Sequence, residues 1–327
     1  MAIAALLENF LSAVAAVTAT GSGTKETSYY TALNNLLDAA GNTLKPKVRC
    51  VMQLKNLGAG NPDGGFFTAD QFDRKTDAPK QPGSPARGVI EVKAPAEAVS
   101  VTTASAQVAK YWDRYKLVLV TNLRDWLLIG ERNGQRVELE RYTLARDEAT
   151  FWEIVAHPRK ADHEHGSTFA DFLARVLRHN APLAEPRDLA WLLASYAREA
   201  RHRIELADPK ALAQLSALKS SLEKALGASF DQEQGEHFFR STLVQTLFYG
   251  LFSAWVLRHE QGKPGPFDWK TAAHDLHVPM ISALFEQLSQ PTKLNALGLT
   301  PVLDWAGDAL TQPVDYRTQL SSAARSS

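Results

Sequence analysis

GVIEVKAP, residues 88–95, is a short apolar strand pattern that carries one acid, Glu91, and one base, Lys93. Side chains at positions i and i+2 of a strand lie on the same face. Glu91 and Lys93 are therefore expected to share one face, whereas Ile90 and Val92 point into the core. Because charged groups on a central strand need compensating partners, the stretch predicts a functional site as well as a strand.

Other β-rich runs, separated by turn residues, lie on both sides of this strand and predict a sheet. They cover residues 48–54, 65–72, 117–121, 125–129 and 136–139. Helices are expected among them at 26–40, which follows Thr24 as a candidate N-cap, and at about 103–111. The polar Pro/Gly-rich stretch 73–86 is expected to be a loop between strands.

The remaining parts of the chain favour helices. Residues 1–18 are apolar, but no Lys or Arg precedes the apolar run and Glu8 interrupts it, so an amphipathic helix packed on the domain is favoured over a signal peptide. After residue 160 the apolar periodicity is almost entirely helical. The expected fold class is α/β, with a mixed central sheet flanked by helices in residues 1–160, followed by an all-α domain in 161–310 and a flexible tail in 311–327.

The composition narrows the class of protein. The 327 residues contain 36 Lys and Arg, 36 Asp and Glu, and 45% apolar residues, which excludes a disordered chain. A single cysteine, Cys50, excludes an intramolecular disulfide and a cysteine-based zinc site, and it favours a reducing, cytoplasmic location. Zero net charge argues against nucleic-acid binding by the whole surface and leaves a local basic groove open. No stretch is apolar enough to predict a membrane span.

A second acid is expected next to Glu91. Asn61-Pro62-Asp63-Gly64 places a carboxylate at the start of the strand over 65–72. If that strand pairs with residues 88–93, Asp63 meets Glu91, and Lys93 lies beside them. Mg²⁺ prefers such a site, with one or two carboxylates, several waters and a phosphate oxygen. A neighbouring lysine can position or deprotonate a metal-bound water. The alternative interpretation is an exposed charge pair on an edge strand and a simple Pro-Asp turn.

These residues resemble the PD-(D/E)xK nuclease pattern. The resemblance implies a restriction-endonuclease-like fold, Mg²⁺ with Mn²⁺ as a substitute, and hydrolysis of DNA phosphodiester bonds. It assigns the metal to Asp63, Glu91 and the backbone carbonyl of Val92, and it assigns assistance of the attacking water to Lys93. Glu26, on the helix before the strands, corresponds to an extra acid near the metal in many members.

Gln107 and Tyr111 match the Gln-x-x-x-Tyr spacing of several branches of that superfamily. They lie one helical turn apart on one face. The resemblance implies either a contact with substrate or structural support at the interface between helix and sheet.

Longer segments extend the resemblance over roughly residues 20–310. QVAKYWDRYKLVLVTNLRDWLLIG and GEHFFRSTLVQTLFYGLFSAWVLR are similar to the nuclease and the helical connector of single-chain restriction-modification enzymes of types IIG and ISP. No Asn-Pro-Pro or Asp-Pro-Pro occurs, so neither the methyltransferase nor an S-adenosylmethionine site is expected in these residues. The implied partners are double-stranded DNA and methyltransferase and target-recognition domains, in cis or as a separate subunit.

Two other functions stay open. The chain is alternatively a catalytically weak module that clamps DNA or assembles a methyltransferase complex. A recombination-type exonuclease shares the same motif. No Walker-type glycine loop indicates ATP hydrolysis, and no motif supports Ser-His-Asp catalysis.

Several further groups have both a structural and a functional interpretation. Residues 162–165, Asp-His-Glu-His, are expected to form a solvated loop rather than a metal site. Lys45, Lys47 and Arg49 are candidates to line the nuclease cleft. A basic cluster is either a solvated helix face or a DNA-phosphate contact, and an aromatic stripe is either core or a docking surface. The cluster comprises Arg198, Arg201, His202 and Arg203; the stripe comprises Phe238, Phe239, Phe248, Tyr249, Phe252 and Trp255.

Overall fold

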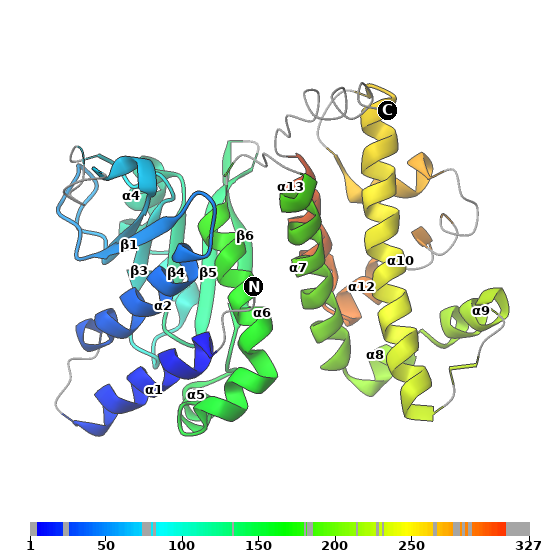
Figure 1. The fold of residues 1–327 in the computed structure, drawn as a ribbon, viewed down its shortest axis with the longest axis horizontal. Coiled ribbons are helices and arrows are strands. Elements are labelled where there is room, and N and C mark those ends of the chain that lie inside the picture. Colours follow the sequence, from blue (N-terminus) through cyan, green and yellow to red (C-terminus); the bar gives the residue numbers. More distant parts are fainter. Residues whose placement is uncertain are drawn as a thin grey trace. The chain divides into compact units, whose positions relative to one another are not determined.

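The computed structural model describes residues 5–21, 26–73, 80, 83–132, 134–179, 181, 186–213, 215–226, 229–230, 232–263, 267–276, 282, 285–286 and 290–311. The chain forms two compact units, Met1–Ala181 and Pro182–Ser327. The first contains a sheet with helices packed on it, and the second is helical (Figure 1). Within the described residues, no helix has the length and apolar character needed to cross a membrane.

The sheet of the first unit has six strands in chain order, and all six predicted strands are present. Neighbouring strands are antiparallel except β3 and β4, which are parallel, so the expected mixed sheet is confirmed. The strands are β1 (Val48–Met52), β2 (Gly64–Thr68), β3 (Val89–Val92), β4 (Val118–Thr121), β5 (Asp125–Arg132) and β6 (Gln135–Thr143).

β3 is a central strand rather than an edge strand. It lies between β2 and β4, and all four of its residues are buried. Its parallel partner β4 requires a crossover, which α3 (Val99–Thr103) and α4 (Ala106–Tyr115) provide. The helix predicted at about 103–111 corresponds to α4, which begins and ends later along the chain, and the short helix α3 precedes it. Ser105 separates them, because its hydroxyl accepts a hydrogen bond from the Val108 amide and caps α4.

Four further α-helices are described in this unit: α1 (Leu6–Ala19), α2 (Tyr30–Asn42), α5 (Glu148–Val155) and α6 (Pro158–Arg178). The predicted N-terminal helix packs on the domain as expected. The Phe10 ring on α1 lies 6.1 Å from Trp126 on β5, which in turn lies 5.4 Å from Phe169 on α6. A short 3₁₀ turn, η1 (Thr27–Tyr29), precedes α2. The candidate N-cap Thr24 lies outside the described residues.

α6 belongs to the first unit, so the units divide after residue 181 and not near residue 160. A buried ion pair joins Arg175 on α6 to Glu140 on β6, with 2.9 Å between Nε and Oε2. The predicted loop at 162–165 is wrong, because Pro158 begins a helix that runs through it. In that helix Asp162 accepts hydrogen bonds from the backbone N–H groups of Leu7 and Glu8, at the first turn of α1.

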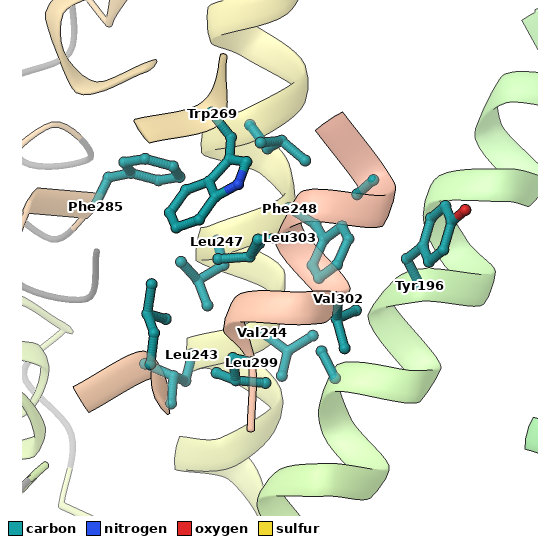
Figure 2. Packing of buried hydrophobic residues seen from close by; sticks show 14 of the residues in the cluster. Tyr196, Leu243, Val244, Leu247, Phe248, Trp269, Phe285, Leu299, Val302 and Leu303 are labelled. Atoms are coloured by element: carbon teal, nitrogen blue, oxygen red, sulfur yellow. The ribbon is translucent and has the colours of Figure 1, made fainter. Parts of the chain in front are cut away.

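The second unit is built from helices around one apolar core. Figure 2 shows side chains of α10, such as Leu247, in the same cluster as Val302 and Leu303 of α13 and Tyr196 of α7. The predicted all-α region is confirmed. The predicted tail lies outside the described residues from 312 onward. The elements are α7 (Pro186–Glu205), α8 (Pro209–Ala213), α9 (Ser216–Leu226), α10 (Gln232–Glu260), η3 (Trp269–Asp275), α12 (Pro291–Ala296) and α13 (Thr300–Thr311).

Candidate active site

The pairing of β2 with β3 places Asp63 beside β3. The antiparallel register joins Gly64 to Ile90 and Gly65 to Val89, so Asp63 is the next residue along, at the level of Glu91. The backbone N–H of Val92 donates to Asp63 Oδ2 at 2.7 Å. As expected, Asp63 therefore lies beside β3 at the level of Glu91.

Asp63 is held by a second donor that the sequence pattern did not indicate. The Tyr30 hydroxyl, from the first turn of α2, donates to Asp63 Oδ1. Burial raises the pKa of Tyr30, and the hydrogen bond to Asp63 raises it further, so the phenol stays protonated. The sequence contains no signal for Tyr30, because the 3₁₀ turn η1 lies between Glu26 and α2.

Glu91 and Lys93 share one face of β3, as the i, i+2 rule predicts. Lys93 Nζ lies 2.9 Å from Glu91 Oε1 and 3.8 Å from Glu26 Oε1. Glu91 is 2% exposed, and its other oxygen, Oε2, is buried with no hydrogen-bond partner among the described residues. The site therefore contains a buried carboxylate that is only partly satisfied, which is costly unless a cation joins it.

Burial and neighbouring charges together shift the pKa values of these groups. Burial raises the pKa of Glu91 to about 7, the Asp63 charge adds to this, and Lys93 opposes it. Burial also raises the pKa of Glu26; Lys93 opposes this, and Glu97, which the sequence pattern did not single out, reinforces it. For Lys93, burial favours the neutral form, but the hydrogen bond and charge of Glu91 outweigh it and raise the pKa. The lysine is therefore an ammonium in this site.

The donors present fit Mg²⁺. The orphaned Glu91 oxygen and the Asp63 carboxylate supply hard anionic ligands, and Mg²⁺ is commonly held by one or two carboxylates with waters. The N–H and C=O of one strand residue point to the same side, so the Val92 carbonyl faces the edge where its N–H meets Asp63. Over the part of the chain that the structure describes, no group of three or more His, Cys, Asp or Glu side chains is assembled as a metal site.

Gln107 and Tyr111 form a hydrogen-bonded pair on α4. Gln107 Nε2 donates to the Tyr111 hydroxyl at 2.8 Å, and the Tyr111 side chain is fully buried. Its ring lies against Gly60, where a Cβ would come within 3.5 Å of the ring and where φ is +108°. Tyr111 therefore packs between α4 and the loop that leads to Asp63, whereas Gln107 is exposed.

The basic residues at the start of β1 lie at the end of that strand away from Asp63. Met52, at the end of β1, pairs with Gly64 next to Asp63, whereas Val48 pairs with Thr68 at the opposite end of both strands. The Gln53 N–H donates to the Asp63 carbonyl, so Gln53 marks the end of the strand that lies next to Asp63. Lys47 precedes Gln53 by six residues, which corresponds to about 20 Å along an extended strand. The Arg49 guanidinium instead stacks over the Phe72 ring at 4.8 Å. The register places Lys47 far from Asp63, and a role of Lys45, Lys47 and Arg49 in lining a DNA cleft stays a prediction.

The basic cluster of α7 makes bonds within its own unit. Arg201 Nε lies 2.8 Å from Glu205 Oε1, and its Nη2 lies 2.8 Å from His237 Nε2. Arg203 pairs with Glu199 at 2.8 Å and donates to the Gly298 carbonyl. These pairings favour the structural interpretation of Arg201 and Arg203 over a phosphate contact.

The aromatic stripe of α10 divides between core and surface. Phe239 and Phe248 are buried, whereas Tyr249 is 68% exposed. Tyr249 lies at a groove of about 840 Å³ between α7 and α10 whose lining is mostly apolar. Phe239 and Phe248 therefore belong to the core, and docking of a partner at the exposed residues stays a prediction.

Comparison with protein-family models, curated proteins and solved structures finds no match to this chain.

Proposed function

We propose that this chain is a metal-dependent endonuclease that hydrolyses DNA phosphodiester bonds, with a PD-(D/E)xK fold in its first unit. One observation carries the proposal: Asp63, Glu91 and Lys93 lie together at the junction of β2 and β3, and Glu91 keeps a buried oxygen without a partner among the described residues. Buried perturbed carboxylates with a specific charged neighbour are typical of functional sites.

Asp63, Glu91 and the Val92 carbonyl would hold the Mg²⁺. When bound, the ion supplies charge stabilisation at the phosphate and lowers the pKa of a coordinated water. Lys93 is protonated in this site, so we infer that it donates a hydrogen bond and offsets developing negative charge, and that it does not begin the reaction as a base. Glu26 contacts Lys93 from the start of η1 and holds its ammonium near Glu91.

The substrate would be double-stranded DNA, with 5′-phosphate and 3′-hydroxyl products as the resemblance implies. The second unit would act as the helical connector to methyltransferase and target-recognition parts of a restriction-modification or phage-defence system. Its continuous core around α10 and α13 suits a rigid spacer.

A second candidate is a catalytically weak DNA-clamping or assembly module. The observation that favours it is the ion pair in which Lys93 already occupies Glu91 Oε1, together with the lack of a three-residue ligand cluster among the described residues. Metal-dependent cleavage separates the two candidates.

The test is cleavage of supercoiled and linear DNA by the full chain with Mg²⁺ and with a chelator. We expect nicking and linearisation of closed circles that the chelator stops. Glu91→Gln should lower the rate by more than about a hundredfold, a larger loss than outer-shell changes cause. Glu138→Gln is the matched control, because Glu138 is an exposed acid of the same sheet that pairs with Arg141. Equal cleavage by both variants, or no cleavage by the native chain, would reject the nuclease proposal. Cleavage of linear DNA alone would favour an exonuclease.

A further inference from the structure

Without hydrogen-bond partners, the Asp63 side chain would be free to rotate. Asp63 precedes the first residue of β2, and it is only partly buried. The terminal torsion of an aspartate is broad, so its two oxygens have no fixed direction without partners. Two donors from different elements remove this freedom: the Val92 N–H from β3 at Oδ2 and the Tyr30 hydroxyl from α2 at Oδ1.

We propose that Tyr30 is a positioning residue of the candidate active site, whose hydroxyl fixes the Asp63 carboxylate in the orientation that binds a divalent cation. The inference rests on the proposed function and deepens it. Tyr30 touches neither the ion nor the substrate in this assignment; it acts through Asp63.

The chemistry of the donor supports this role. A phenol is neutral, so its hydrogen bond orients Asp63 without cancelling the negative charge that a cation needs. An ionised carboxylate has about four acceptor positions, so one bond at each oxygen leaves capacity at both. Glu91, in contrast, receives the cationic donor Lys93. The site thus gives a neutral donor to one carboxylate and a charged donor to the other.

The neighbouring tyrosine provides a matched control. Tyr29 and Tyr30 are both 8% exposed, but the Tyr29 hydroxyl lies 3.4 Å from Thr18 Oγ1 of α1 and does not contact the site. Tyr29→Phe and Tyr30→Phe therefore remove the same atom from the same degree of burial. Both keep the ring, so the packing of α2 is preserved in each.

The experiment is calorimetric titration of the full chain with Mg²⁺ without DNA, followed by cleavage at increasing Mg²⁺. We expect Tyr30→Phe to weaken Mg²⁺ binding about tenfold or more, the scale of second-shell losses. Its cleavage should recover at saturating Mg²⁺, because the reacting groups are intact. Tyr29→Phe should match the native chain in both measurements. A loss of structure alone would not produce this separation between metal affinity and saturated rate.

Ultraviolet difference absorbance of the native chain on addition of Mg²⁺ adds a readout that does not depend on the folding of Tyr30→Phe. We expect a tyrosine signal in the native chain and in Tyr29→Phe, because the Tyr30 hydroxyl is bonded to a ligand of the ion. Mg²⁺ binding without that signal, or equal Mg²⁺ affinities of the two variants, would overturn the role of Tyr30 and leave the nuclease proposal standing. A native chain that neither binds Mg²⁺ nor cuts DNA would overturn both.

Discussion

Lys93 and Glu91 form a hydrogen-bonded ion pair along β3, with 2.9 Å between Lys93 Nζ and Glu91 Oε1. The acid is almost fully buried, whereas the side chain of the base is 22% exposed. The ammonium satisfies one carboxylate oxygen and leaves the other without a partner among the described residues. In the metal-free site the Lys93 ammonium therefore supplies part of the positive charge that a metal ion would supply. Lys93 and a bound divalent ion would then share the Glu91 carboxylate.

Lys93→Ala should abolish cleavage and keep Mg²⁺ binding. We expect a loss of about a hundredfold to ten-thousandfold in rate, the range for groups that assist proton transfer or orient the water. Mg²⁺ affinity should stay the same or increase, because the ammonium no longer competes for Glu91. Plasmid cleavage and calorimetry measure the two effects. Full cleavage by the purified variant would contradict the role of Lys93.

Asp63→Asn should lower the pKa of Glu91. The Asp63 charge is one of the causes that raise that pKa, and a neutral amide removes it. Asparagine can still accept from the Val92 N–H and can donate to the Tyr30 oxygen, so metal-free stability should be preserved. Asp63→Ala loses both bonds and should destabilise the chain by about 1–3 kcal/mol. NMR titration and chemical denaturation measure these effects; an unchanged Glu91 pKa would show that the two carboxylates are not coupled.

Metal-free stability should fall as the pH rises from about 4.5 to about 7. Glu91 has a folded pKa of about 7 against an ordinary value of 4.5, so the folded state holds the proton more tightly over that interval. When the folded state binds more protons, stability decreases with rising pH. Melting temperatures in chelator should show this slope in the native chain and a smaller one in Glu91→Gln. Mg²⁺ should stabilise the native chain more at pH 8 than at pH 5, because the ion needs the ionised acid. Parallel slopes for the two chains would contradict the assignment.

Tyr111 should contribute more to stability than Gln107. Tyr111→Ala opens a cavity beside Gly60 and should cost about 3–5 kcal/mol, as deletions of buried aromatic rings do. Gln107→Ala removes the hydrogen bond to the buried Tyr111 hydroxyl and should cost about 1–3 kcal/mol. Chemical denaturation measures both. An increased KM for DNA in Gln107→Ala, in a chain that is folded under the assay conditions, would show that Gln107 contacts substrate.

DNA binding by the full chain should be weak, without sequence preference and sensitive to salt. Its net charge is zero, so few phosphate contacts are available to release counterions. Lys47→Ala should leave cleavage unchanged, because Lys47 lies at the far end of β1 from Asp63. Titrations at two salt concentrations and cleavage assays measure these properties. A discrete fragment pattern would show that these residues read a target sequence.

The strands and the approach of Asp63 to Glu91 could be predicted because they depend on local pattern and on one strand pairing. The part played by Tyr30 could not, because the 3₁₀ turn at Thr27–Tyr29 changes the phase of the helix that follows. A uniform helix from residue 26 predicts Tyr29 on the apolar face and gives no partner for Tyr30. The position of Lys47 relative to the site depends on the direction and length of β1, which the charge pattern does not contain.

The boundary between the two units depends on which unit α6 packs against. α6 has an apolar face that either unit could bury, and the sequence alone does not say which. In the structure Phe169 and Phe172 pack on Tyr142 of the sheet, which assigns the helix to the first unit. Sequence periodicity indicated helix after residue 160, but it did not indicate that α6 packs on the sheet.

The packing of α6 on the sheet determines where the chain can be truncated without exposing its core. A fragment that stops at residue 160 would uncover Trp126 and Tyr142 and would take the Arg175 cation away from a buried acid, Glu140. Such a piece would be prone to aggregate, and an inactive preparation of it would say nothing about the chemistry of Asp63. A fragment ending at Ala181 keeps these contacts, so the smallest part of the chain to assay alone is about 20 residues longer than a boundary at residue 160 would give.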